Sequence, residues 1–105
     1  MKHAVIRTLD IVPGARPAVL RAVLAHRRRC LRDEPGTLQV EVLVPRDEPH
    51  RIHLYELFSD DDACDAHLGG DSMSQMQHEI GHLVTGLVAI ACQLGVQRLE
   101  AETQS

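Results

Sequence analysis

The chain has 105 residues, which is enough for one domain with one hydrophobic core but not for two. We therefore expect a single domain over residues 1–105. Hydrophobic residues make up 44% and charged residues 25% of the chain, which is the composition of a globular protein rather than a disordered one. The formal net charge of −4 gives no bulk attraction to nucleic acid, so we expect no nucleic-acid partner.

Two further features concern location. The apolar tract at residues 83–94 is too short to span a bilayer, and the first residues lack the uninterrupted apolar core of a signal peptide, so we expect no membrane partner. The three cysteines, Cys30, Cys64 and Cys92, are odd in number and widely spaced, unlike a disulfide framework. These features predict reduced thiols in a cytoplasmic protein.

The first half of the chain predicts a strand, a helix and a strand. Residues 3–12 are rich in strand-forming residues and are followed by a Pro-Gly pair. A helix is predicted from Pro17 to the residue before Glu34. Its apolar stripe comprises Leu20, Val23, Leu24 and Leu31. From 37 to 44, apolar and polar residues alternate, which predicts a second strand with one covered face.

The second half predicts a strand, two helices and a strand. Residues 51–58 alternate, and this places Glu56 on the same face as three apolar residues. Acidic residues at 60–62 open a helix that ends at a Gly-Gly pair, and residues 71–84 predict another helix. A strand over 87–96 completes a βαββαβ order. We therefore predict an α+β, ferredoxin-like fold with an antiparallel four-stranded sheet.

One short motif suggests metal chemistry. His78, Glu79 and His82 match HExxH, in which two histidines one helical turn apart bind zinc and the glutamate acts as a base. The position of a third metzincin ligand holds Val88, and few other ligand-type residues follow. We therefore interpret the motif as the exposed face of an amphipathic helix and predict no metal site. A zinc metalloprotease is a remote alternative.

Three longer segments favour a different assignment. They are DEPGTL at 33–38, HLYE at 53–56 and ACDAH at 63–67. In their order and spacing they resemble the antibiotic biosynthesis monooxygenase family, in which an EPG turn enters the second strand, an LYE-like segment ends the third, and an A-x-x-A-H helix follows. One difference is that Gly70 and Ser72 stand where members often carry Ser and His.

The resemblance implies both a quaternary structure and a reaction. Members pair two sheets into a dimeric α/β barrel, so a homodimer is expected, and a core with only 2% aromatic residues would gain from it. The implied reaction is the oxidation of a small aromatic substrate, such as a phenol, hydroquinone or anthrone, by molecular oxygen without a cofactor. The alternatives are a non-catalytic dimeric ligand-binding module and a small-molecule isomerase.

Candidate site residues follow from these patterns. His67 could take a proton from an acidic phenol or could instead cap its helix, and Glu56 could orient His67 or form a bridge to an arginine. We predict His67 and Glu56 as the catalytic pair. The substrate-binding candidates are Tyr55, His53, Met73 and Met76. Each has a structural interpretation as well: interface for Tyr55, a strand residue without chemistry for His53, and adaptable core for the methionines.

Overall fold

The computed structural model describes residues 1–93. Its elements are, in chain order, β1 (His3–Ile11), α1 (Arg16–Asp33), β2 (Thr37–Leu43), β3 (Arg51–Phe58), α2 (Asp61–Leu68), α3 (Asp71–Ile80), the short 3-10 turn η1 (Gly81–Leu83) and β4 (Val84–Gln93). The order confirms the predicted βαββαβ arrangement, with two consecutive helices between the third and fourth strands.

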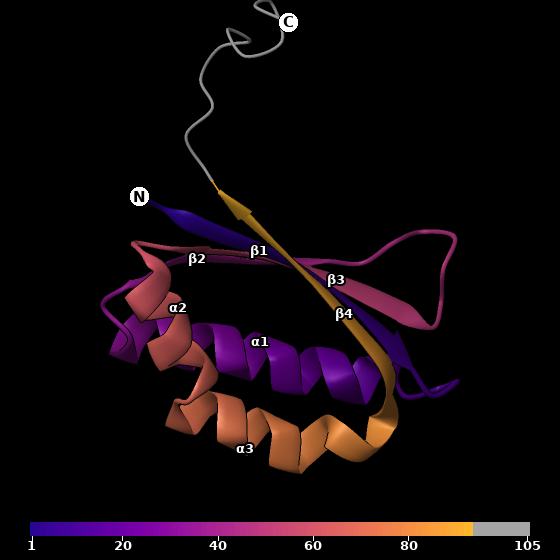
Figure 1. The fold of residues 1–105 in the computed structure, drawn as a ribbon. Coiled ribbons are helices and arrows are strands. Elements are labelled where there is room, and N and C mark those ends of the chain that lie inside the picture. The colour runs from indigo at the N-terminus through magenta and orange to yellow at the C-terminus, as the bar shows by residue number, and fades with distance from the viewer. Residues whose placement is uncertain (94–105) are drawn as a thin grey trace, which may run out of the picture.

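The four strands form one antiparallel sheet in the order β2-β3-β1-β4. All three helices lie on the same side of this sheet, with α1 and α3 running beneath it and α2 at one end (Figure 1). The α+β, ferredoxin-like fold is therefore confirmed. Because the two central strands are β1 and β3, side chains from both meet on the face that the helices cover.

The main core lies between the sheet and helices α1 and α3. It is aliphatic, as the low aromatic content predicts, and its fully buried members include Val19, Val23, Ile52 and Leu54. A smaller cluster joins Cys64 of α2 to Val5 and Phe58 of the sheet. At about 25 cal/mol for each Å² of apolar surface removed from water, this burial is the main stabilising contribution to the fold.

The buried stripe of α1 differs from the predicted one. The buried positions are Val19, Ala22, Val23, His26 and Cys30, whereas Leu24 and Leu31 are 40% and 37% exposed. The observed spacing is also that of one helix face. The predicted buried face is rotated about the helix axis relative to the observed one, because the prediction used the leucines and left out His26 and Cys30, which occupy core positions.

Helix α3 ends at Ile80, four residues before its predicted end. Glycine is a poor helix former, and at Gly81 the chain tightens into η1 before Val84 pairs with Ile11 in the sheet. The HExxH segment therefore spans the end of an α-helix, and both of its histidines are exposed. The predicted last strand is confirmed as far as Gln93, and residues 94–96 lie outside the described residues.

The other face of the sheet is covered by no helix among residues 1–93. Its exposed apolar side chains, 42–60% accessible, are Ile6, Leu43, Val88 and Ile90. Tyr55 lies on this open face opposite Ile6, so it faces away from Glu56 as predicted. No helix within the described residues is long and apolar enough to cross a membrane.

Candidate functional site

A mostly apolar cavity of about 330 Å³ lies between the covered face of the sheet and α3. Its lining residues are Arg7, Leu9, Leu54, Leu68, Met73, Met76, Gln77, Ile80, Gly81, Val84 and Leu87. The volume is at the lower end of the range for small-molecule sites, about 300–1,000 Å³. A cavity with apolar walls and a few polar groups is the usual form of such a site. Arg7 supplies its only charge.

Arg7 reaches this cavity because of its position in β1. It shares the covered face with Val5 and Leu9, and its side chain is 11% exposed. Its Nε donates a hydrogen bond to Glu56 Oε1, which lies on the neighbouring strand. Within residues 1–93 this is the one side-chain hydrogen bond of Arg7, and its terminal nitrogens, Nη1 and Nη2, are not among the fully buried atoms without a partner. These nitrogens are therefore available to a ligand.

Glu56 and His67 meet behind Arg7. Glu56 Oε2 lies 3.0 Å from His67 Nε2, as an ion pair whose angles depart from those of a hydrogen bond. His67 Nδ1 lies 2.7 Å from Glu34 Oε1, and Thr37 Oγ1 donates to the same oxygen at 2.8 Å. The result is a chain of alternating charges, Arg7, Glu56, His67 and Glu34. It runs from the cavity to the protein surface, where Glu34 is 21% exposed.

The loop and helix geometry behind this chain explains the sequence motif. A side chain at Gly36 would collide with Ala63, so glycine allows α2 to lie against the start of β2. Helix α2 begins where the Asp60 side chain accepts a hydrogen bond from the Ala63 backbone. Gly36 of the EPG segment and Ala63 of the A-x-x-A-H segment, together with the Asp60 cap, thus set the position of α2, and with it that of His67.

The two ends of the Glu56–His67 pair have opposite pKa shifts. Burial opposes the charged form of His67, but contacts with Cys30, Glu56 and Glu34 outweigh it and raise the pKa of His67 to about 10. Burial also opposes ionisation of Glu56, but His67 and Arg7 outweigh it and lower the pKa of Glu56. Both groups are therefore charged at neutral pH.

A second buried polar group lies next to His67 on α1. Arg29 donates through Nε to Ser72 Oγ at 2.8 Å, and Ser72 Oγ lies 2.8 Å from His26 Nδ1. The Ser72 hydroxyl proton is then free to point at His26, which favours a neutral imidazole. Burial, and then repulsion from His67, lower the pKa of His26. Ser72, at the position where the family often has histidine, therefore joins α1 to α3.

His26, Cys30 and His67 are the one trio of buried metal-type residues whose ligand atoms converge in the described part of the chain, all within 4.8 Å. Their geometry does not suit an ion. Both nitrogens of His67 face carboxylates. Cys30 Sγ is 3.5 Å from each ring nitrogen of His26, so it lies over the ring and not along a nitrogen lone pair. We interpret the trio as packing.

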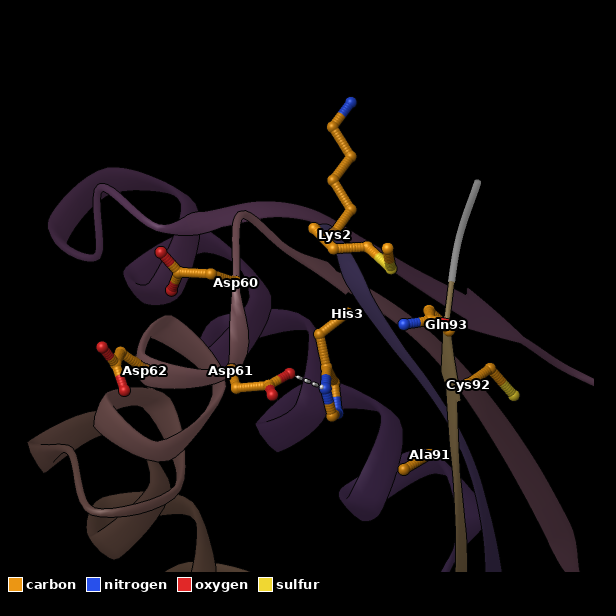
Figure 2. Close-up of a pocket in the computed structure, with 9 residues that line it drawn as sticks. Lys2, His3, Asp60, Asp61, Asp62, Ala91, Cys92 and Gln93 are labelled. Carbon is orange, nitrogen blue, oxygen red and sulfur yellow. Dashed lines mark hydrogen bonds and ion pairs between the residues drawn. The ribbon is translucent and has the colours of Figure 1, made fainter. Parts of the chain in front are cut away.

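A larger hollow, of about 570 Å³, lies at the N-terminal end of α2. Figure 2 shows His3 pointing at Asp61 across it, with Asp60 and Asp62 directed outward and Gln93 at its edge. Three of its polar side chains are engaged locally, because His3 Nδ1 lies 2.7 Å from Asp61 Oδ1 and Asp60 caps α2. The hollow is open and mostly polar, and its residues do not converge on one point.

The sequence-predicted site residues separate into three groups. His67 and Glu56 lie together, yet neither lines the apolar cavity, and Arg7 connects them to it. Met73 and Met76 line the cavity. His53 and Tyr55 lie on the open face of the sheet, where His53 Nδ1 is 3.0 Å from Thr8 Oγ1. That His53 and Tyr55 bind substrate stays a prediction, and it requires a partner subunit that packs on the open face and completes a site there.

Arg7 and Glu34 are the site residues that sequence analysis missed. Arg7 had a signal, because it is the one charged residue on the apolar side of an alternating strand, just as Glu56 is in β3. Two opposite charges isolated on apolar strand faces predict an ion pair. The prediction that Glu56 would either orient a histidine or bridge to an arginine posed these as alternatives, and it does both.

The fold and the site define a small α+β, ferredoxin-like protein with a partly open apolar cavity between its sheet and α3. The sequence profile described as "Antibiotic biosynthesis monooxygenase" matches residues 3–79, and the chain belongs to this family. No curated protein sequence matches it.

Solved structures with the same fold come from several bacteria. Two are provisionally described as antibiotic biosynthesis monooxygenases. The one from Nitrosomonas europaea is 18% identical, with 91% of each chain covered and a TM-score of 0.84. The one from Caulobacter crescentus CB15 is 21% identical, with 90% of each chain covered and a TM-score of 0.85. Protein SO0527 from Shewanella oneidensis is 25% identical over 87% of this chain and 88% of that one, with a TM-score of 0.78. The similarity to these structures is one of fold.

Proposed function

We propose that this protein is a cofactor-independent monooxygenase that oxidises a small aromatic compound, such as a phenol, hydroquinone or anthrone, with molecular oxygen. The observation that carries the proposal is the apolar cavity with the Arg7 guanidinium at its wall, in a chain of the antibiotic biosynthesis monooxygenase family. Flat aromatic rings suit walls of leucine and methionine, and the single cationic group suits the oxygen that must ionise before oxidation.

The reaction balances without an added reductant. A phenol or anthrone releases a proton to solvent, and its anion passes one electron to oxygen, which leaves a substrate radical and superoxide. The two combine into a peroxide anion, which takes up a proton, loses water and gives the quinone or ketone. One oxygen atom enters the product and the other leaves as water, and the substrate supplies all the electrons. The protein needs only to bind the anion, exclude bulk water and admit oxygen.

The roles proposed for His67 and Glu56 depend on protonation. With a pKa of about 10, His67 already carries its proton at neutral pH and acts as a base only after losing it. We therefore propose that the pair serves the reaction through Arg7. Glu56 holds the Arg7 guanidinium in place, and His67 competes for the charge of Glu56, so the positive charge of Arg7 is not fully neutralised. If His67 is instead the base, the rate will rise with pH up to about 10 even for a phenol whose own pKa lies well below that value, whereas otherwise the rate will level off at the pKa of the phenol.

The test is an oxygen-uptake screen of phenols, hydroquinones and anthrones with protein that has been treated with a chelator. We expect at least one compound to consume one oxygen for each quinone formed. Uptake that returns only after a metal ion or flavin is added would contradict the cofactor-free reaction.

A non-catalytic ligand-binding module is the second candidate. The observation that favours it is that His67 and Glu56 are sealed behind Arg7 and do not line the cavity. A compound that binds in the cavity without any oxygen uptake would support this candidate over the enzyme.

We also propose that the protein is a cytoplasmic homodimer. The cytoplasmic location is supported by the three cysteines, which form no disulfide with one another. The open face of the sheet supports the dimer, because it exposes large apolar side chains that a second sheet packed on it would remove from water. A substitution such as Val88→Glu, which places a charge in this face, should convert the dimer to a monomer in light scattering at micromolar concentration. Thr85→Glu, at the start of β4, is the control. A wild-type monomer under these conditions would contradict the proposal.

A further inference from the structure

We propose that the cavity selects an aromatic anion, a flat apolar molecule with one ionised oxygen function, which the terminal nitrogens of Arg7 bind. This inference rests on the proposed function for its location and names the substrate class of the same cavity. It states that the ligand is already ionised when it binds. The proposed oxidation would also allow a neutral substrate that loses its proton after binding.

The first support is that a charged residue, Arg7, lies in the wall of an otherwise mostly apolar cavity. Except for Arg7 and Gln77, the residues around the cavity are apolar or glycine, so the guanidinium is largely removed from water. Its Nε is engaged by Glu56, while Nη1 and Nη2 make no side-chain hydrogen bond within residues 1–93 and keep some accessible surface. An anionic acceptor in the cavity would give these donors charge-assisted hydrogen bonds, which are stronger than those to a neutral molecule.

The second support is the charge arrangement behind Arg7. Glu56 alone would neutralise the guanidinium, but it also pairs with His67, 3.0 Å away. The counter-charge of His67 is shared with Glu34, which is partly exposed and screened by solvent. The charge of Glu56 is therefore divided between Arg7 and His67, and the guanidinium of Arg7 keeps part of its positive charge toward the cavity.

Arginine also determines the form of the ligand. Its planar guanidinium remains charged at any physiological pH and offers donors side by side, which match a carboxylate, a phenolate or an enolate with a neighbouring carbonyl. Hydrogen bonds to charged groups contribute about 1.5–3 kcal/mol, or roughly a tenfold to hundredfold difference in affinity. We expect a preference of this size for an anion over a neutral molecule of the same shape.

The experiment compares 2-naphthoate with 2-naphthamide, its neutral analogue of nearly the same shape, by titration calorimetry at pH 7.5. Neither is expected to be oxidised, so binding is read separately from turnover. The wild type should bind the naphthoate at least tenfold more tightly. The double variant Arg7→Gln/Glu56→Gln removes the buried pair without changing the net charge and should bind both compounds equally. The variant Arg51→Gln/Glu48→Gln removes a surface ion pair with the same charge change and should keep the preference.

The outcomes separate the two proposals. Equal affinities in the wild type, no naphthoate binding at millimolar concentration, or a preference that survives in the double variant would each overturn the inference. If the double variant does not fold, Arg7→Lys serves instead, and it should keep a weaker preference for the anion. A failure of the oxygen-uptake screen would count against the monooxygenase and leave the anion preference unaffected.

Discussion

Replacing Glu56 by alanine should destabilise the protein by about 3–5 kcal/mol, the range seen when one partner of a buried ion pair is removed. The carboxylate is 1% exposed and pairs with both Arg7 and His67, so its loss leaves two buried cations facing each other without a counter-charge. Urea unfolding at pH 7 measures the effect.

Two controls define the cause. Glu34→Gln removes a carboxylate from the other side of His67, but this one is partly exposed, so the loss should be clearly smaller. Glu48→Gln breaks a surface pair with Arg51 and should change stability by less than about 0.5 kcal/mol. If Glu56→Ala is no more destabilising than Glu48→Gln, the charge chain does not hold the site together.

The stability of the wild type should fall as the pH rises from 7 to 8.5. The pKa of His67 is raised from 6.5 to about 10 in the folded state, so across this window the folded protein holds a proton that the unfolded chain releases. Stability from His67 is fully present below pH 6.5 and is lost as the pH rises through about 10. The slope from one such group reaches about −1.4 kcal/mol per pH unit.

The window from pH 7 to 8.5 is chosen because two other buried groups, His26 and Cys64, titrate mainly outside it. The pKa of His26 is lowered from 6.5, so His26 adds only a small slope of opposite sign near pH 7, and this slope vanishes as the pH approaches 8. Burial raises the pKa of the Cys64 thiol from 9.0, so its contribution has the same sign as that of His67 and becomes appreciable only toward pH 8.5, the upper end of the window. His67→Gln should therefore flatten the slope between pH 7 and 8.5. An unchanged slope in that variant would mean that His67 is not the protonated group.

The sequence was sufficient to predict most of the fold because its strands alternate clearly and are bounded by turn residues. In β3, alternation alone placed Glu56 on the covered face and Tyr55 on the open one, as observed. The end of α3 was harder, because apolar residues continue past Gly81 and periodicity does not reveal where a helix gives way to a strand.

The site was predictable only in part. His67 and Glu56 were found because each is a polar residue within a recognisable segment. Their distance from the cavity depends on how α2 packs on the sheet, which no local pattern encodes. Arg7 was missed because a charged residue in a strand is usually solvent-exposed, although its place on the apolar side of β1 indicated a buried ion pair. His26 was missed because a leucine-based stripe hides a histidine in the core.

The most direct test of the proposed function is oxygen uptake with the cavity filled. Met76 lines the cavity on α3, and Met76→Trp should occupy much of its volume while the charge chain stays intact. With a substrate from the screen, the variant should lose nearly all oxygen uptake yet remain folded and dimeric. Leu24→Trp, on the exposed side of α1, should retain the wild-type rate. Wild-type uptake by a folded Met76→Trp variant would show that the reaction takes place elsewhere and would contradict this assignment of the site.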